Sequence, residues 1–351
     1  EIEQNRYKVS SVKLSKTVMN KLRKNSKKKS SYASNKIEGN PLSEKQVNEV
    51  IESDERKHYL KPEQEVRNYF LALNYLEEKV KNKEKFSKQL ILDVQKLVEK
   101  GASKEKIGLR GPMPPGVLFA VYDSKTGNPD YIPPEYCDIP GLLDELVEYV
   151  NTTDDHPLIV AAVVHYQLVT IHPFEDGNGR TARLLSGYIM DLNGYGFNGI
   201  GSLEEYFAYD IDEYYESIQM GLPALYYSGR ENPPHPEIWI NYFLRMVKLY
   251  SGKVCDLQLA SEEEDIAGSL SFLKGKEKEL LLFLMKNYRG EFTPIEISRE
   301  LSVTNKTVIN RLTMLVKNGF VIPILVNKRI RSYELSEFTK KKEKKIIKAI
   351  S

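Results

Sequence analysis

The chain has 351 residues, of which 41% are hydrophobic and 28% are charged, as is usual for water-soluble globular proteins. It contains no apolar run of the roughly 18 residues that a membrane-spanning helix needs. Its polar, basic N-terminus lacks the apolar core of a secretion signal. Cys137 and Cys255, the only cysteines, stand far apart and support neither a disulfide framework nor a cysteine zinc site. We therefore expect a cytoplasmic protein of about two domains, with no membrane contact.

The net charge of +2 is spread unevenly along the chain. Residues 1–30 hold 10 Lys and Arg against 2 acidic residues, and residues 276–351 hold 17 against 8, so the region between them is acidic. Basic ends around an acidic body place any nucleic-acid contact at the ends. Solvated helix faces and a basic tail would give the same composition.

Residues 1–100 are predicted to be helical, because apolar residues recur at helical spacing in 64–80 and 86–102. Glycine and proline then become dense in residues 108–140, which breaks helices. Two β-like runs within this segment flank the turn-rich "DSKTGNP". They predict a β-hairpin at about 117–132 that protrudes from a helical body.

Helical patterns resume after residue 140, and the almost wholly apolar segment 157–171 predicts a buried central helix. A domain boundary is expected near residues 259–278. Beyond it, three helical patterns followed by an alternating ribbon predict a winged helix-turn-helix domain at 276–337 and a basic tail at 338–351. The expected fold is mainly α, with an N-terminal helical region at 1–100 and a core at 101–255.

The stretch "HPFEDGNGRTAR", residues 172–183, concentrates unusual chemistry. Gly177, Asn178 and Gly179 precede a helix, and such a turn can aim several backbone N–H groups at one anion beside the positive end of the helix. Arg180 and Arg183 are three residues apart, so they share a helix face near this turn. Guanidinium groups bind phosphate oxygens in pairs, so the pattern predicts a phosphate site.

Two further side chains in this stretch suggest what happens at that phosphate. Asp176 borders the turn and is placed to hold Mg²⁺ against a polyphosphate. His172, with an ordinary pKa of about 6.5, can accept a proton from a hydroxyl near neutral pH. Each residue alone is common in purely structural roles, but together they predict nucleotide chemistry. The absence of His-Glu-x-x-His excludes a metalloprotease, and His165 is expected in the core.

The same stretch matches, at every specified position, the Fic family motif His-x-Phe-x-Asp/Glu-Gly-Asn-Gly-Arg-x-x-Arg, and residues 30–250 resemble that family. The resemblance implies a helical bundle with a β-hairpin flap. It also implies transfer of AMP from ATP, with Mg²⁺, to a Ser, Thr or Tyr hydroxyl of a target protein. Self-modification and pairing of two copies are further implications.

The resemblance assigns a role to each residue of the motif. His172 deprotonates the target hydroxyl, Asp176 holds Mg²⁺, the Gly177–Gly179 turn and Arg180 bind phosphates, and Arg183 binds the γ-phosphate. The hairpin, with Tyr131 and Ile132, corresponds to the flap that clamps the target's backbone by strand addition.

A second short stretch, "SNKIEGN", resembles the family's inhibitory motif Ser/Thr-x-x-x-Glu-Gly/Asn through Ser34, Glu38 and Gly39, in a helix at about 30–40. By analogy Glu38 pairs with Arg183 and competes with the γ-phosphate, which implies an autoinhibited enzyme. An alternative is removal of AMP by the same site, with Glu38 orienting a water molecule.

The adenine contact is less defined by the sequence. "DEYYESI" resembles the family segment that supplies aromatic contacts, which makes Tyr214 and Tyr215 candidates, although core tyrosines would give the same pattern. Leu222 stands where many relatives have an Asn, so the ribose contact is not carried over.

The C-terminal domain leaves two interpretations open. A recognition helix at about 305–317 would turn Lys306 and Arg311 outward, and Arg329 would lie on the wing, which suits contact with DNA phosphates. Winged helices also serve in dimerisation and protein docking. The alternative function is therefore a DNA-binding transcriptional regulator whose Fic body senses nucleotide.

Overall fold

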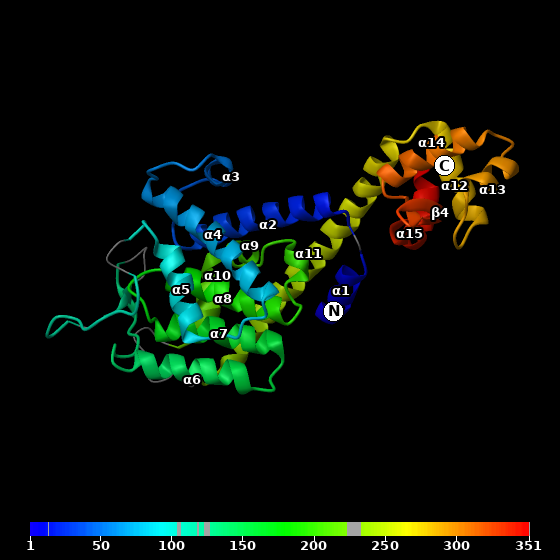
Figure 1. Ribbon diagram of the computed structural model, residues 1–351. Helices are drawn as coiled ribbons and strands as arrows, with labels where there is room; N and C mark the ends of the chain where they lie inside the picture. The colour runs from blue at the N-terminus through cyan, green and yellow to red at the C-terminus, as the bar shows by residue number, and fades with distance from the viewer. Residues whose placement is uncertain (13, 104–106, 118, 123–126, 223–232, 351) are drawn as a thin grey trace. The chain divides into compact units, whose positions relative to one another are not determined.

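The computed structural model describes residues 1–12, 14–103, 107–117, 119–122, 127–222 and 233–350. As predicted, it is mainly helical, and its described strands form two small antiparallel sheets of two strands each. The chain divides into two units (Figure 1): Glu1–Ser10 with Met19–Cys255, and Ser11–Val18 with Asp256–Ser351. Within the described residues, none of the helices has the length and apolar character needed to cross a membrane.

The first unit begins with five helices. They are α1 (Ile2–Ser11), α2 (Lys16–Ile37), α3 (Glu44–Glu52), α4 (Lys61–Lys81) and α5 (Lys88–Glu99). Helix α2 is longer than the expected segment at 30–40, because the lysine-rich stretch before it is also helical. Three of its lysines pair with acids elsewhere in the unit: Lys27 with Glu77, Lys28 with Glu52, and Lys29 with Glu205. Part of the positive charge at this end of the chain therefore holds α2 in place.

The centre of the first unit is built on α7 (Pro157–Ile171) and α8 (Asn178–Leu192), which pack along each other. Most of α7 is buried, as its apolar sequence predicts. Around this pair lie α6 (Ile139–Thr152), the short η1 (Phe197–Gly199), α9 (Glu204–Phe207) and α10 (Ile211–Gln219). The connection from α7 to α8 is the 172–177 part of the histidine–glycine–arginine stretch, so the two central helices position it.

Within the described residues, the predicted hairpin is represented by two short strands. Strands β1 (Val121–Tyr122) and β2 (Pro129–Tyr131) pair antiparallel, whereas residues 118 and 123–126 lie outside the described residues. The hydroxyl of Tyr131 donates a hydrogen bond to the Thr170 carbonyl at 2.6 Å, and Tyr131 is buried. The base of the hairpin is thus tied to the end of α7.

Helix α11 (Pro236–Ser271) runs through most of the segment where we predicted a domain boundary. The two units divide between Cys255 and Asp256, inside this helix. The helix continues into the segment because residues 259–271 contain no proline and are rich in Leu, Ala and Glu, which favour helix.

Besides the later part of α11, the described part of the second unit contains four helices and a ribbon. They are α12 (Gly275–Asn287), α13 (Pro294–Glu300), α14 (Asn305–Lys317), β3 (Val321–Val326), β4 (Arg329–Leu335) and α15 (Glu337–Ile350). Thr293 and Thr304 cap α13 and α14 by accepting backbone N–H bonds. The strands β3 and β4 pair antiparallel beside these helices.

The predicted basic tail at 338–351 is helix α15 from residue 337 to 350. Ile346 is fully buried in the core of the unit, and Phe338 and Ile350 pack against that core. Lys342 and Lys345 both pair with the buried Glu262 of α11. The lysine-rich end is therefore part of the folded unit.

Candidate active site

His172 ends α7 in a left-handed backbone conformation, with φ at 47°. Its carbonyl accepts a hydrogen bond from Nε of Arg110 at 2.8 Å, and the backbone N–H of Arg110 donates to the Pro173 carbonyl at 2.9 Å. These two bonds fix the turn that carries the imidazole. A non-glycine residue in this conformation is uncommon and is held by its surroundings.

The imidazole of His172 is arranged to act as a base. Its Nδ1 lies 3.2 Å from the Val169 carbonyl, which can only accept, so the neutral ring carries its proton on Nδ1 and leaves the Nε2 lone pair for another proton. Burial lowers the pKa of His172 to about 4; the Val169 bond opposes this shift, and the nearby Arg110 charge adds to it. The ring is therefore neutral at neutral pH.

The glycine turn after His172 is held by its own polar groups. The backbone N–H of Phe174 donates to Oδ1 of Asn178, and Nδ2 of Asn178 donates to the Phe174 carbonyl. Asn178, predicted as a phosphate ligand, thus uses its side chain to close the loop, while its backbone begins α8. Gly177 has φ at 81°, and a Cβ there would lie 2.7 Å from a carboxylate oxygen of Glu99, so glycine is required.

Arg180 is surrounded by carboxylates. Its buried guanidinium lies 2.9 Å from Glu99, 3.1 Å from Asp176 and 3.9 Å from Glu65. Burial raises the pKa of Glu99 to about 7, although Arg180 opposes the rise. Arg180 was predicted to bind phosphate. In this structure it lies at the centre of an acidic cluster next to the glycine turn. Sequence reasoning missed Glu65 and Glu99, because neither belongs to a recognisable motif.

Arg183 is held by the end of α2. Its Nε donates to Oγ of Ser34 at 2.8 Å, and its Nη2 donates to the Ser34 carbonyl at 3.1 Å and to the Glu38 carboxylate at 2.6 Å. Gly39, with φ at 80°, ends the turn that follows α2. A Cβ on Gly179 would overlap Oε1 of Glu38, so this carboxylate lies directly against the start of α8. The structure thus brings Ser34, Glu38 and Arg183 together.

The two candidate adenine tyrosines have different surroundings. Tyr214 is 1% exposed, accepts a hydrogen bond from Nη1 of Arg183 at 3.3 Å, and lies 2.8 Å from Nε2 of the buried His165. Tyr214 therefore lies in the core. The sequence left open whether it contacts adenine or is a core tyrosine. Tyr215 is 47% exposed and can offer a ring face, with its hydroxyl 3.5 Å from the Ile37 carbonyl at the end of α2.

Asp176 is the one motif carboxylate that fits a magnesium ligand. Its Oδ1 accepts the Gly177 N–H at 2.8 Å, and its side chain is 29% exposed beside the turn. The described residues contain no group of three or more His, Cys, Asp or Glu arranged to hold a metal. Mg²⁺ commonly takes one or two carboxylates and completes its shell with phosphate oxygens and water. Asp176 therefore suits a metal that arrives with a nucleotide.

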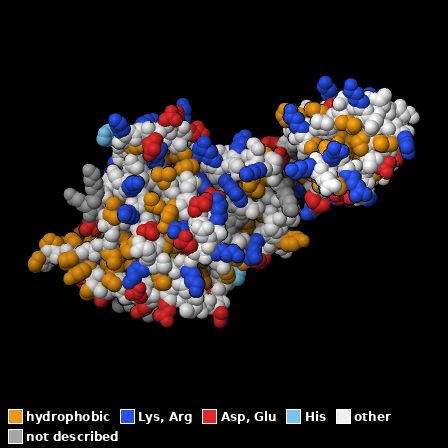
Figure 2. All heavy atoms as spheres, in the orientation of Figure 1, with side chains coloured by type: hydrophobic (Ala, Val, Ile, Leu, Met, Phe, Trp, Pro, Cys, Tyr) orange, Lys and Arg blue, Asp and Glu red, His pale blue; other side chains and the backbone are white. Residues whose placement is uncertain are grey.

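The hairpin region exposes apolar side chains, and Figure 2 shows hydrophobic atoms gathered at the end of this unit from which the hairpin protrudes. The exposed large apolar residues of this segment are Ile107, Leu109, Met113, Val117, Tyr122 and Tyr136. Among the predicted flap residues, Tyr131 is buried at its base and Ile132 is partly buried. In the second unit, Lys306 and Arg329 are exposed on α14 and β4, and Arg311 is partly exposed.

The fold and site define a helical domain built around a histidine–glycine–arginine turn whose last arginine is paired with an N-terminal helix. Residues 85–190 match the family model described as the Fic/DOC family, so the chain contains a Fic/DOC family domain. The protein adenylyltransferase fic-1 of Caenorhabditis elegans is 45% identical over 67 residues, which are 18% of this chain and 13% of that protein. The protein adenylyltransferase Fic of Drosophila grimshawi is 29% identical over 171 residues, 47% of this chain and 33% of that protein.

Solved structures share the fold at low identity. A Fic domain containing signaling protein from Bacteroides thetaiotaomicron aligns with a TM-score of 0.57 and 21% identity, over 75% of this chain and 97% of that one. A Fic family protein from Desulfovibrio desulfuricans aligns with a TM-score of 0.54 and 19% identity, over 90% of this chain and 88% of that one. The chain spans a third or less of the length of the two curated relatives, so their similarity is confined to the domain around the site.

Proposed function

We propose that the protein is an adenylyltransferase that moves AMP from ATP to a Ser, Thr or Tyr hydroxyl of a target protein and is held inactive by Glu38. The observation that carries this proposal is the arrangement on one turn. His172 has an available Nε2, Asp176 and the glycine turn follow, and Arg183 is occupied by the Glu38 carboxylate at 2.6 Å. The names of the curated relatives support the same activity.

The nucleotide would lie along the start of α8. Backbone N–H groups after Gly177, whose own N–H bonds to Asp176, and the positive end of the helix favour the phosphates, and Arg183 favours the terminal one. Asp176 would hold Mg²⁺, which supplies positive charge to the phosphate oxygens. Arg180 is enclosed by Glu99 and Asp176, so its main contribution is to orient the Asp176 carboxylate from below.

His172 would perform the proton transfer. Its neutral Nε2 takes the proton of the target hydroxyl as that oxygen forms a bond to the α-phosphorus of ATP. The bond from the α-phosphorus to the bridging oxygen breaks in line, and pyrophosphate leaves with the electron pair. The products are a phosphodiester between AMP and the target, pyrophosphate, and a protonated histidine that returns its proton to solvent.

Glu38 would act as the brake by competing for Arg183. A carboxylate and a γ-phosphate are both anions that use the same guanidinium donors. While Glu38 and Ser34 occupy Arg183, the terminal phosphate has no cationic partner at this point of α8. Displacement of the end of α2 would release Arg183 for the nucleotide.

The target would approach over the hairpin. The strand β2 is paired on one side by β1, and the surrounding segment exposes apolar side chains such as Val117 and Tyr122. An extended target segment could add to the hairpin and bury these side chains, which is a common mode of peptide capture. Self-modification follows the same chemistry with a hydroxyl of this chain. Pairing of two copies is part of the proposal and is tested by light scattering.

The position of an isotope label distinguishes AMP transfer from phosphate transfer. With ATP labelled at the α-phosphate, the protein or a supplied target should gain label that survives denaturation, most readily when Glu38 is Gly. With ATP labelled at the γ-phosphate, the label should appear only in pyrophosphate. Covalent γ-label would contradict the proposal, as would α-label that persists after His172→Ala.

We further propose that the second unit is a winged helix that contacts DNA phosphates. Exposed Lys306 and Asn310 on α14 and exposed Lys328 and Arg329 at the β3–β4 ribbon support this proposal. DNA binding by the full chain should weaken in Lys306→Ala and Arg329→Ala, with a shallower dependence on salt. Lys276→Ala, which removes an exposed α12 lysine paired with Glu279, is the matched control. Equal affinity of all three variants would favour protein docking instead.

A further inference from the structure

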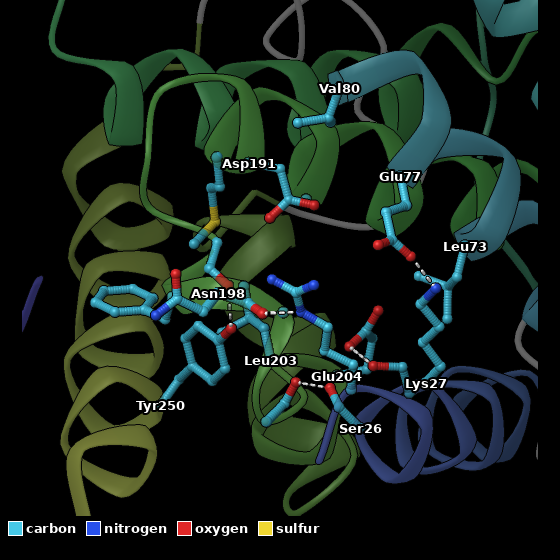
Figure 3. A pocket seen from close by; sticks show the side chains of 18 of the residues that line it. Ser26, Lys27, Leu73, Glu77, Val80, Asp191, Asn198, Leu203, Glu204 and Tyr250 are labelled. Atoms are coloured by element: carbon cyan, nitrogen blue, oxygen red, sulfur yellow. Dashed lines mark hydrogen bonds and ion pairs between the residues drawn. The ribbon is translucent and has the colours of Figure 1, made fainter. Parts of the chain in front are cut away.

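A cavity lies beside α2 in the first unit, and of the residues used in the proposed reaction only Arg183 lines it. Its volume is about 380 Å³, and it is formed by α2, α4, the later part of α8, the 194–204 connection and Tyr250 of α11 (Figure 3). This volume lies within the range of pockets that bind small organic ligands. Much of the wall is apolar, including Val80, Met190, Phe197 and Leu203.

The α2 side of the cavity is the same helix face that reaches the active site. Arg23, Ser26, Lys27 and Ser30 line the cavity, and Ser34 follows one turn later and bonds to Arg183. Residues spaced by three or four share a helix face. Arg183 itself is one of the residues that line the cavity. A ligand here would touch the helix that carries the Glu38 brake.

Most polar groups around the cavity already have partners. Ser26 donates to the Gly201 carbonyl, and Lys27 pairs with Glu77. Glu204 accepts hydrogen bonds from Tyr69, Ser30 and Ser202 at 2.8 to 2.9 Å. These contacts hold α2 against the other walls of the cavity. Two ionisable side chains of the cavity do not have a full set of hydrogen-bond or ion-pair partners among the described residues.

The first is Asp191, whose side chain points into the cavity in Figure 3. Its backbone carbonyl accepts from the Gly194 N–H, but among the described residues its carboxylate has no hydrogen bond or ion pair. Burial raises its pKa to about 7, and the charges of Glu204 and Glu77 add to the rise. A Cβ on Gly196 would overlap Oδ1 of Asp191, so Gly196 makes room for this carboxylate. The carboxylate is set into the cavity, yet part of the residue is exposed to solvent. A donor or cation that enters the cavity can therefore reach it and give it the partner it lacks.

The second is Arg23. Its Nε donates to the Asn198 carbonyl at 2.7 Å, whereas its two Nη groups have no hydrogen-bond or ion-pair partner within the described part of the chain. Arg23 and Asp191 do not form an ion pair with each other, yet the Arg23 charge opposes the rise in the Asp191 pKa. The cavity therefore presents one carboxylate and one guanidinium fork, separated by a space between apolar walls.

We propose that this cavity binds a small zwitterionic molecule of the α-amino-acid class, with its ammonium on Asp191, its carboxylate on Arg23 and its side chain against the Met190–Phe197 wall. A molecule that carries both charges satisfies both groups, whereas a simple amine or a simple acid leaves one of them unmatched. Because Arg23 belongs to α2 and Asp191 to α8, the bound molecule joins the two helices. It thereby holds α2 where Glu38 reaches Arg183.

Calorimetry on the full chain tests the binding. A panel of the common α-amino acids is titrated first, and the tightest one is then compared with its decarboxylated amine and its deaminated acid. The amino acid should bind more tightly than either analogue. Arg23→Gln and Asp191→Asn should each weaken it about tenfold or more, because each removes one charged hydrogen-bond partner. Lys29→Gln, on α2 but outside the cavity, should leave the affinity unchanged.

Gly196→Ala gives a second route to the same answer. It keeps both charged groups but fills the space in which the Asp191 carboxylate lies, so it should also abolish binding. Each variant is checked for an unchanged circular dichroism spectrum. The proposal is overturned if no amino acid binds at millimolar concentration, or if Arg23→Gln and Asp191→Asn both bind the amino acid as tightly as the unmodified protein does.

Hydrogen exchange tests the coupling to the brake. The bound amino acid should slow exchange of the backbone amides of residues 30–39, and this readout does not depend on any enzymatic activity. Only the consequence for AMP transfer rests on the proposed function: the amino acid should slow transfer in the unmodified protein and leave the Glu38→Gly variant unaffected. Unchanged exchange at 30–39 in the saturated protein would remove the coupling. Binding and protection without any AMP transfer would overturn the proposed function and leave the cavity site standing.

Discussion

Replacing Glu38 by Gly should strengthen the binding of ATP far more than the binding of ADP or AMP. In the structure the Glu38 carboxylate lies 2.6 Å from Nη2 of Arg183 and against the start of α8. Only a nucleotide with a γ-phosphate competes for this guanidinium. Replacing Glu38 therefore removes the group that competes with the γ-phosphate for Arg183. The contacts of the α- and β-phosphates stay nearly as they were.

The size of the effect follows from the exposure of the pair. The Arg183 side chain is 1% exposed and that of Glu38 is 32% exposed, so the contact is a charged hydrogen bond with one partly solvated partner. Such bonds contribute roughly 1.5 to 3 kcal/mol, and partial solvation favours the lower half of this range. A gain of about 2 kcal/mol corresponds to roughly thirtyfold tighter ATP binding.

Calorimetric titration of the three nucleotides into the unmodified protein and Glu38→Gly measures this difference. Lys36→Ala, which changes an exposed residue in the last turn of α2, is the control and should bind all three nucleotides like the unmodified protein. Equal gains for ATP, ADP and AMP would refute the competition argument, because they would show that Glu38 merely blocks access to the site.

Three further predictions follow from the same contacts. His172→Ala should lower AMP transfer about a hundredfold or more. With His172 present, the transfer rate of Glu38→Gly should stay level across neutral pH and fall only as the pH drops toward about 4, where the imidazole gains a proton. A fall in rate centred near pH 6.5 would contradict the argument that burial lowers the pKa of His172. Ser34→Ala removes one of the Arg183 hydrogen bonds and should raise AMP transfer less than Glu38→Gly does, as initial rates of label incorporation would show. The raised pKa of Glu99, about 7 against an ordinary 4.5, means that the folded state retains a proton which the unfolded state releases in this window. The free energy of unfolding should therefore fall as the pH rises from about 4.5 to 7. In Glu99→Gln, free energies measured by urea unfolding at several pH values should change less steeply with pH.

The sequence was most informative where function is carried by adjacent residues. His172, Asp176 and Arg183 lie within one turn and the start of one helix, so their spacing already indicated a shared site. Glu38 could be connected with Arg183 only through its own short motif, since 145 residues separate the two. Glu99 could not be found in this way, because its position under the glycine turn depends on how α5 packs against α8.

One error of interpretation has a clear physical cause. The lysine-rich end was predicted to be a tail, although Phe338, Ile346 and Ile350 lie at helical spacing and pack on the core of their unit. The high charge of this segment hides its weak apolar periodicity. The segment 259–278, where a boundary was expected, is largely the continuation of α11, and the two units divide just before it, at Cys255 and Asp256.

The central claim is that His172 transfers AMP and that Glu38 restrains it. Its most direct test is the intact mass of the unmodified protein, Glu38→Gly, and Glu38→Gly with His172→Ala, each incubated with Mg²⁺ and ATP. The account predicts a gain of one AMP mass that is largest in Glu38→Gly and absent from the double variant. An equal gain in the double variant, or a larger gain in the unmodified protein than in Glu38→Gly, would contradict it.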